Sequence, residues 1–178
     1  MFLSTNKRIF LKYIAWILFV IALPCTMLGC AAEPSKKVED AQFTEPTLVV
    51  ESVTTEIGAT DVQLLVRVYQ NPGVAGATIQ LDFDANLVLR DVINGNVMGT
   101  MDFSKSNLGT RPFRCSWDSI EGESAENGDL LILVFDVPDT AVAGEIFDVG
   151  ISYRTGDVYN DNWEDVNFTI VKGSITVK

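Results

Sequence analysis

NPGVAGATIQLDFDANLVLRD, residues 71–91, is the stretch from which the fold of this chain can be derived. After an Asn-Pro-Gly turn, apolar residues alternate with Thr78, Gln80 and Asp82, which is the period of a strand with one buried and one solvent-facing side. The apolar set is Ala77, Ile79, Leu81 and Phe83. A strand with one dry side needs a second sheet to cover it, so the stretch predicts a β-sandwich.

Segments of the same kind recur along the chain, with turn residues between them and no helical period. They are Leu48–Val53, Val62–Gln70, Leu87–Ile93, Val97–Phe103, Pro112–Trp117, Leu130–Val137, Phe147–Tyr153 and Val166–Val177. Together these about nine strands predict an all-β, nine-stranded jelly-roll sandwich over residues 47–178. Asn94-Gly95 is a hairpin signal, and the Leu130–Val137 run is apolar on both faces, which predicts the most central strand.

The N-terminal residues 1–30 have the features of a targeting segment and are excluded from the fold. Three basic residues precede the apolar run Tyr13–Leu23, and Gly29-Cys30-Ala31-Ala32 then resembles a bacterial lipoprotein cleavage box. We therefore expect a lipoprotein signal peptide with lipid attached at Cys30, an uncleaved signal anchor being the alternative. Residues 31–46 are polar and predict a tether. Both alternatives place the domain outside the cytoplasm, held at the cell membrane.

The composition excludes several classes of function. The formal net charge is −11, and it becomes −14 without the three basic residues of the targeting segment, Lys7, Arg8 and Lys12. An acidic domain outside the cytoplasm repels phosphate backbones, so nucleic acid is not an expected partner. The chain has no histidine, so neither a Ser-His-Asp nor a Cys-His nucleophile can be assembled from it.

Cysteine and carboxylate patterns also argue against catalysis and against a metal site. Cys25 and Cys30 belong to the targeting segment, which leaves Cys115 without a partner and the chain without a CxxC motif. Cys115 alternates with apolar neighbours and is expected to be buried. Asp82 and Asp84 are too close in sequence to identify a glycosidase by themselves. We predict a protein that is not an enzyme and has no cofactor.

The order of several motifs resembles the cohesin domain, the module by which cellulosome scaffolds capture proteins that carry dockerins. Gly73-Val74-Ala75-Gly76 running into Ile79–Asp84 is similar to the third cohesin strand. Asn127-Gly128-Asp129 before Leu130–Val137, and Ala143-Gly144-Glu145 before Phe147–Ser152, resemble two later strand entries. The end of the chain, from Phe168 to Gly173-Ser174-Ile175-Thr176-Val177, resembles the closing signature of the family. The resemblance covers residues 48–178.

The resemblance implies a nine-stranded jelly roll that docks a dockerin on one outward sheet face, formed by strands three, five, six and eight. The partner-binding positions that it implies are Gly76, Thr78, Gln80, Asp82, Arg114 and Ser116. Many cohesins have Asn and Asp where this chain has Gly76 and Thr78. That departure implies either a different partner or contacts at other positions, and a role in polysaccharide degradation is an expectation from the family.

Two alternatives remain open from the residues alone. Exposed aromatic residues can stack on sugar rings, so Tyr159 and Trp163 in a polar loop are candidates for carbohydrate binding, whereas Tyr153 is in register with the core. Oxygen ligands for calcium could come from the same loop, namely Asp157, Asn160, Asp161, Asn162 and Asp165. Their spacing does not match the EF-hand pattern, so we favour a polar loop without a metal ion. A sandwich that serves as a spacer is the remaining hypothesis.

Overall fold

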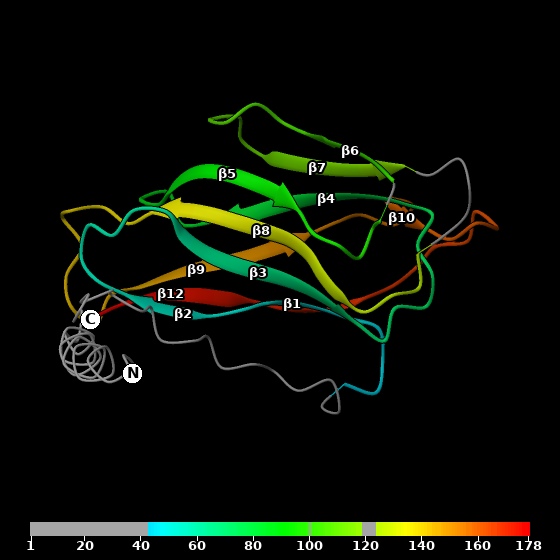
Figure 1. Cartoon of the computed structure of the whole chain (residues 1–178), viewed down its shortest axis with the longest axis horizontal. Helices are drawn as coiled ribbons and strands as arrows, with labels where there is room; N and C mark the ends of the chain where they lie inside the picture. The colour runs from blue at the N-terminus through cyan, green and yellow to red at the C-terminus, as the bar shows by residue number, and fades with distance from the viewer. Residues whose placement is uncertain (1–42, 100, 119–123) are drawn as a thin grey trace, which may run out of the picture. The chain divides into compact units, whose positions relative to one another are not determined.

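The computed structural model describes residues 43–99, 101–118 and 124–178, which form two β-sheets and contain no α-helix (Figure 1). Within this part of the chain one sheet has five strands, in the order β11 (Thr169–Val171), β1 (Thr47–Val50), β3 (Val62–Tyr69), β8 (Gly128–Asp136) and β5 (Val88–Asn94). The other sheet has the order β2 (Val53–Thr55), β12 (Gly173–Val177), β9 (Ile146–Ser152), β4 (Gly76–Phe83), β7 (Phe113–Asp118) and β6 (Asp102–Lys105). A short strand, β10 (Val158–Tyr159), pairs with the start of β4 and completes this second sheet of seven.

The core lies between the two sheets and is built from the residues that alternate inward. Ile79 and Leu81 of β4 are in one buried cluster with Leu64 and Val66 of β3. The ring of Phe83 meets that of Phe135 on β8 edge-on, with 5.2 Å between the centroids. Such contacts remove apolar surface of both sheets from water, which stabilises the sandwich. The all-β sandwich expected from the sequence is therefore confirmed.

The chain has twelve strand segments in its described part because two expected strands are divided between the sheets. The first expected strand is split at Glu51 and Ser52 into β1 and β2, and the last is split at Lys172 into β11 and β12. β1 pairs in parallel with β11, and β2 pairs in parallel with β12. Counting each divided strand once gives the nine expected strands, to which β10 is added from a segment expected to be a loop.

The hairpin expected at Asn94-Gly95 does not form. β5 pairs with β8 in one sheet and β6 pairs with β7 in the other, so the chain crosses between the sheets here. The Gly95 amide donates to the Leu130 carbonyl oxygen, and a Cβ at this position would lie 1.9 Å from the Asp129 carbonyl oxygen. Glycine is needed at this position because the backbone of β8 approaches it closely.

Two further expectations about the strands need correction. The strand expected at Val97–Phe103 begins only at Asp102, because Val97 and Met98 form a turn whose side chains are buried in the core. β8, expected to be the most central strand, lies between β3 and β5, so β3 holds the centre of the five-stranded sheet. Of the outward residues of this apolar run, Val134 is buried and Ile132 is half-buried.

The N-terminal expectations fall mainly outside the described residues. The targeting segment with Cys30, and the tether up to residue 42, belong to the part of the chain that is not described. At the end of the tether the ring of Phe43 packs against that of Tyr69, with 4.8 Å between the centroids. In the described ranges, the structure has no helix of the length and apolarity needed to cross a membrane.

Candidate functional site

Four strands of the seven-stranded sheet form the face that the sequence analysis singled out. Their order is β9-β4-β7-β6, so the third, fifth, sixth and eighth expected strands lie side by side. Thr78 of β4 is opposite Ser116 of β7, and Ser116 is opposite Ser104 of β6. Residues paired across strands share a face, and Thr78 and Ser116 alternate with buried neighbours, so all three point away from the core.

The six partner-binding residues expected from the sequence are all on this outward face. Gln80 lies between Ser152 of β9 and Arg114 of β7, and Gly76 lies opposite Asp118. Between them, Ala77 and Ile79 of β4 are buried. The structure thus brings the set together in one continuous row across two strands: Gly76, Thr78, Gln80, Asp82, Arg114 and Ser116.

Hydrogen bonds join the neutral and acidic side chains of this face. The hydroxyl oxygens of Thr78 and Ser116 are 3.1 Å apart. Asp82 accepts from Nε2 of Gln80 at 2.9 Å and from Oγ of Ser152 at 2.6 Å. The Asp82 carboxylate is therefore engaged within the face, so it is a weak candidate for a general base or a nucleophile.

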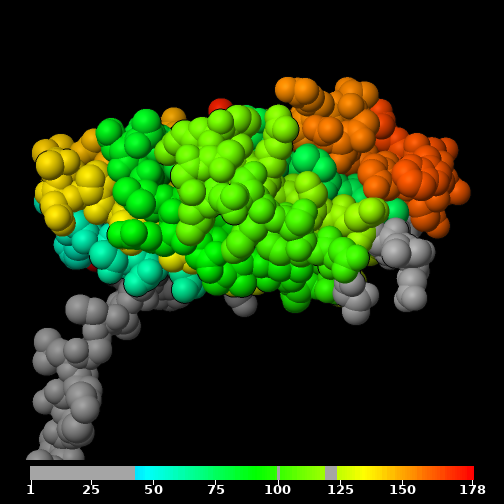
Figure 2. Space-filling view, turned by 90° about the horizontal axis from the view of Figure 1, so that it is seen from above, coloured from blue at the N-terminus to red at the C-terminus, as the bar shows by residue number. Residues whose placement is uncertain are grey.

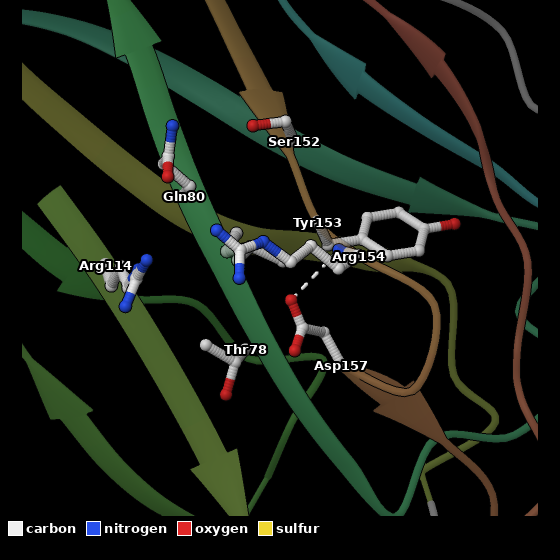
Figure 3. A pocket seen from close by; sticks show the side chains of 8 residues that line it. Thr78, Gln80, Arg114, Ser152, Tyr153, Arg154 and Asp157 are labelled. Carbon is white, nitrogen blue, oxygen red and sulfur yellow. Dashed lines mark hydrogen bonds between the residues drawn. The ribbon is translucent and has the colours of Figure 1, made fainter. Parts of the chain in front are cut away.

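A hollow of about 220 Å³ opens on the face above β4 (Figure 3). The side chain of Arg154, from the loop after β9, extends across β4 toward Arg114. Asp157 also borders the hollow, and its Oδ2 accepts the backbone N–H of Arg154 at 2.9 Å. The hollow is lined by Thr78, Ile79, Gln80, Arg114, Ser152, Tyr153, Arg154 and Asp157. Sequence reasoning did not place Ser152, Arg154 or Asp157 at this face. The pairing of β9 with β4 brings Ser152 there, and the path of the chain after β9 brings Arg154 and Asp157.

Gly76 is covered by a residue from that same path. A Cβ at Gly76 would lie 2.2 Å from Cζ and the hydroxyl oxygen of Tyr159, so the ring lies directly on the glycine. The Tyr159 hydroxyl donates to Oδ1 of Asp118 at 3.2 Å. Desolvation, together with the negative charge of Asp118 and this hydrogen bond, raises the pKa of the Tyr159 phenol. Although Gly76 is on the expected face, a partner would meet Tyr159 there.

Trp163 is the most exposed large apolar side chain of the described residues, with 79% of its surface accessible. Its ring stacks on that of Tyr159, with 5.0 Å between the centroids and 13° between the planes. Its backbone has φ of +62°, a conformation that costs about 1–3 kcal/mol for a residue other than glycine. Side-chain Oδ1 of Asn160 accepts from the amides of Asn162 and Glu164, which holds this turn in place.

The two aromatic residues expected to form a separate sugar site lie instead at the end of the sheet face. Tyr159 rests on β4, and Trp163 rests on Tyr159. Figure 2 shows the segment around them, in orange, beside the surface of β6 and β7. Because the rings stack on each other, they present one ring face to solvent, whereas a sugar platform presents several side by side. Tyr153, expected in the core, packs against it and exchanges hydrogen bonds with the Phe168 backbone.

The remaining expectations concern cysteine and metal ions. Cys115 is fully buried, and this burial raises the pKa of its thiol to about 12, as expected for a small apolar side chain rather than a reactive one. Within residues 43–99, 101–118 and 124–178, no three acidic, cysteine or histidine side chains lie close enough together to hold a metal ion.

Comparisons with known proteins agree with this geometry. No family model matches the sequence, and no curated protein matches it. Solved cohesin structures do match the fold. The seventh ScaB type I cohesin of Pseudobacteroides cellulosolvens has a TM-score of 0.66 and 18% identity, covering 75% of this chain and 92% of its own.

Two other cohesins illustrate the range of the likeness. The sixth cohesin of scaffoldin B from Acetivibrio cellulolyticus, solved in complex with a mutant Cel5 dockerin, has a TM-score of 0.65 and 18% identity, covering 76% of this chain and 100% of its own. A non-cellulosomal cohesin from the archaeon Archaeoglobus fulgidus has a TM-score of 0.63 and 16% identity, and the match covers 75% of this chain and 91% of the cohesin. The chain therefore has a cohesin-like fold.

Proposed function

We propose that this protein is a binding module without catalytic activity, which docks a dockerin-like protein on the outward face of β9-β4-β7-β6. The observation that carries the proposal is the joint presence on this face of an open hollow and an exposed, stacked tryptophan. Tryptophan, tyrosine and arginine are the residues that most often dominate binding energy at protein interfaces. Structures of the same fold include cohesins in complex with dockerins, which supports the class of partner.

The contacts in this proposal differ from those that the family resemblance implies. At Gly76 the partner would meet the ring of Tyr159, and at Thr78 it would meet a hydroxyl instead of a carboxylate. The main contacts would then come from the hollow and from Trp163. Gln80, Asp82, Arg114 and Ser116 would form the rest of the interface.

The test uses the full 178-residue chain, purified in detergent, to capture secreted and surface proteins of its own source organism. Mass spectrometry should identify one or a few proteins that share a dockerin-type calcium-loop repeat, and a chelator should release them. Purified partner should then bind Thr78→Trp or Trp163→Ala at least tenfold more weakly than wild type, a loss of about 1.4 kcal/mol. A matched control is Val88→Ala, an exposed apolar residue on the other sheet.

Two outcomes would overturn the proposal. One is the recovery of no specific protein, and the other is a partner whose affinity is unchanged by substitutions at Thr78 and Trp163. Pull-downs with insoluble polysaccharides run in parallel, because retention that depends on Tyr159 and Trp163 would support the carbohydrate hypothesis instead. The stacked pair offers one ring face, so we expect no retention.

We further propose that the protein is a lipoprotein, anchored outside the cytoplasm through Cys30, and that its partner belongs to a polysaccharide-degrading system. The supporting observation is the order of basic residues, apolar run and Gly29-Cys30 at the N-terminus. Metabolic labelling with an alkyne fatty acid should label the wild-type chain and not the Cys30→Ala variant. Equal labelling of both chains would contradict attachment at Cys30.

A further inference from the structure

Two arginines of the binding face differ from the other arginines of the described chain in having no side-chain partner. Arg67 and Arg90 form ion pairs, and Arg111 lies over the ring of Phe83 at 4.3 Å. Arg114 and Arg154 have neither an ion pair nor a side-chain hydrogen bond to any described residue. Both border the same hollow, so the two free guanidinium groups of residues 43–99, 101–118 and 124–178 lie in one place.

The nearby acidic groups form no ion pair with these arginines. Oδ2 of Asp157 accepts the backbone amide of Arg154, and both oxygens of Asp82 accept from Gln80 and Ser152. With Asp157 at its edge, the hollow has a formal charge of +1 from its lining residues, in a chain of net charge −11. Figure 3 shows the Arg154 guanidinium between Gln80 and Thr78, directed toward Arg114.

We infer that the hollow receives a carboxylate of the docked protein, held between the guanidinium groups of Arg114 and Arg154. The inference rests on the proposed function and adds the chemistry of the partner: its contact surface bears at least one Asp or Glu. A guanidinium presents two parallel N–H donors that match the two oxygens of a carboxylate. Thr78 also lines the hollow, and its hydroxyl, which is hydrogen-bonded to that of Ser116, is a further polar group there.

The surrounding charge makes this recognition selective. The acidic remainder of the domain repels a strongly acidic protein at long range, whereas the two arginines attract a single carboxylate placed at the hollow. Charge complementarity of this kind fixes the register and orientation of a partner more than it adds affinity. The stacked Tyr159 and Trp163 rings lie at the end of the same face and supply the apolar contact.

The test is a selection from a phage-displayed library of dockerin modules whose solvent-facing positions are randomised, with the full chain as target. Clones that no longer bind Thr78→Trp are kept as binders of this face. We expect these clones to be enriched in Asp or Glu, and to bind Arg114→Gln or Arg154→Gln roughly tenfold more weakly than wild type. Arg90→Gln removes the same charge from the other sheet and should leave their affinity unchanged.

A second variant separates charge from geometry. The Arg114→Lys/Arg154→Lys chain keeps both charges and loses the planar fork, so an intermediate loss of affinity is expected. Binding of the clones should also weaken between 50 and 500 mM NaCl, because salt shortens the Debye length and so weakens the attraction between solvent-exposed charges. The arginine variants change exposed residues and Thr78→Trp changes a half-buried one, so the thermal unfolding of every variant is measured to confirm that it folds.

The outcomes distinguish this inference from the proposed function. If the kept clones are not enriched in Asp or Glu, or bind both glutamine variants as well as wild type, the inference is wrong. The proposed docking of a module on this face is then unaffected. If no clone depends on Thr78, the face docks no module, and both are wrong. Direct binding of polygalacturonate that is lost in the same variants would also overturn the inference, since the carboxylate would then come from a polysaccharide.

Discussion

The arginines of the two sheets differ in what they contact. On the five-stranded sheet, Nε of Arg67 lies 3.2 Å from Oε1 of Glu51 and 2.9 Å from Oδ1 of Asp129. On the seven-stranded sheet, Arg114 and Arg154 face a hollow without an ion-pair partner in the described chain. The arginines of the five-stranded sheet are held in ion pairs, which stabilises the fold, whereas Arg114 and Arg154 are available to a partner.

The largest expected effect tests the first half of this comparison. Glu51 is only 4% exposed, so Arg67→Ala removes an ion-pair partner from a buried carboxylate. Arg67→Ala should therefore lower the free energy of unfolding by about 3 kcal/mol. Arg114→Ala removes an exposed, unpaired side chain and should change it by less than about 0.5 kcal/mol. Urea unfolding followed by tryptophan fluorescence measures both, and equal losses would contradict the comparison.

A smaller change in stability is expected where the ring of Tyr159 lies on Gly76 of β4. Gly76→Ala places a Cβ against the Tyr159 ring, and the resulting displacement should cost about 1–3 kcal/mol of unfolding free energy. In a double-mutant cycle with Tyr159→Ala, the double variant should lose less than the sum of the single losses.

Gly150→Ala is the matched control for this cycle. It lies on the same sheet, and its new Cβ would meet only the flexible Lys172 side chain, at 3.3 Å. We expect it to change the unfolding free energy by less than about 0.5 kcal/mol. If Gly76→Ala is as mild as this control, the Tyr159 ring does not press on β4 in solution.

A third prediction gives Arg114 and Arg154 the ion-pair partner that they lack in the described chain. Thr78→Glu places a carboxylate beside Arg114 and Arg154, and the isosteric Thr78→Gln places an uncharged amide there. The Glu variant should be more stable than the Gln variant by roughly 0.2–1 kcal/mol at low salt, and this difference should shrink in 1 M NaCl. Unfolding at the two salt concentrations measures it, and a Glu variant less stable than Gln would show that the hollow does not favour a carboxylate.

The smallest effect concerns the Tyr159 phenol. Its pKa is raised in the folded chain by desolvation and by Asp118. A raised pKa means that the folded state keeps the proton longer, so the associated stability is present at neutral pH and is lost as the pH rises above the ordinary tyrosine value of about 10. An absorbance titration of wild type minus Tyr159→Phe should isolate a phenol that ionises above the ordinary value. A normal value would indicate that the ring is free of β4 and Asp118.

Local patterns of the sequence predicted much of the fold because strand alternation is set by neighbouring residues. The buried face of β4, the burial of Cys115 and the outward position of Arg114 follow from a period of two. The prediction of a hairpin at Asn94-Gly95 was wrong because dipeptide statistics cannot reveal that β5 pairs with β8 and not with the next strand in sequence. β10 was missed because two residues between polar neighbours give no detectable alternation.

The sequence by itself determined the sandwich and the outward residues of β4 and β7, since these depend on side-chain alternation along each strand. Only the tertiary structure decided that Tyr159 covers Gly76, that Trp163 stacks beside it, and that Arg154 reaches across β4 toward Arg114. The contacts of Tyr159 with Gly76 and of Arg154 with the face of β4 join residues that are tens of positions apart in the chain, through a loop whose path depends on pairing with β4. No local pattern encodes such a path, because the partner strand, and not the loop's own neighbours, fixes where its side chains lie.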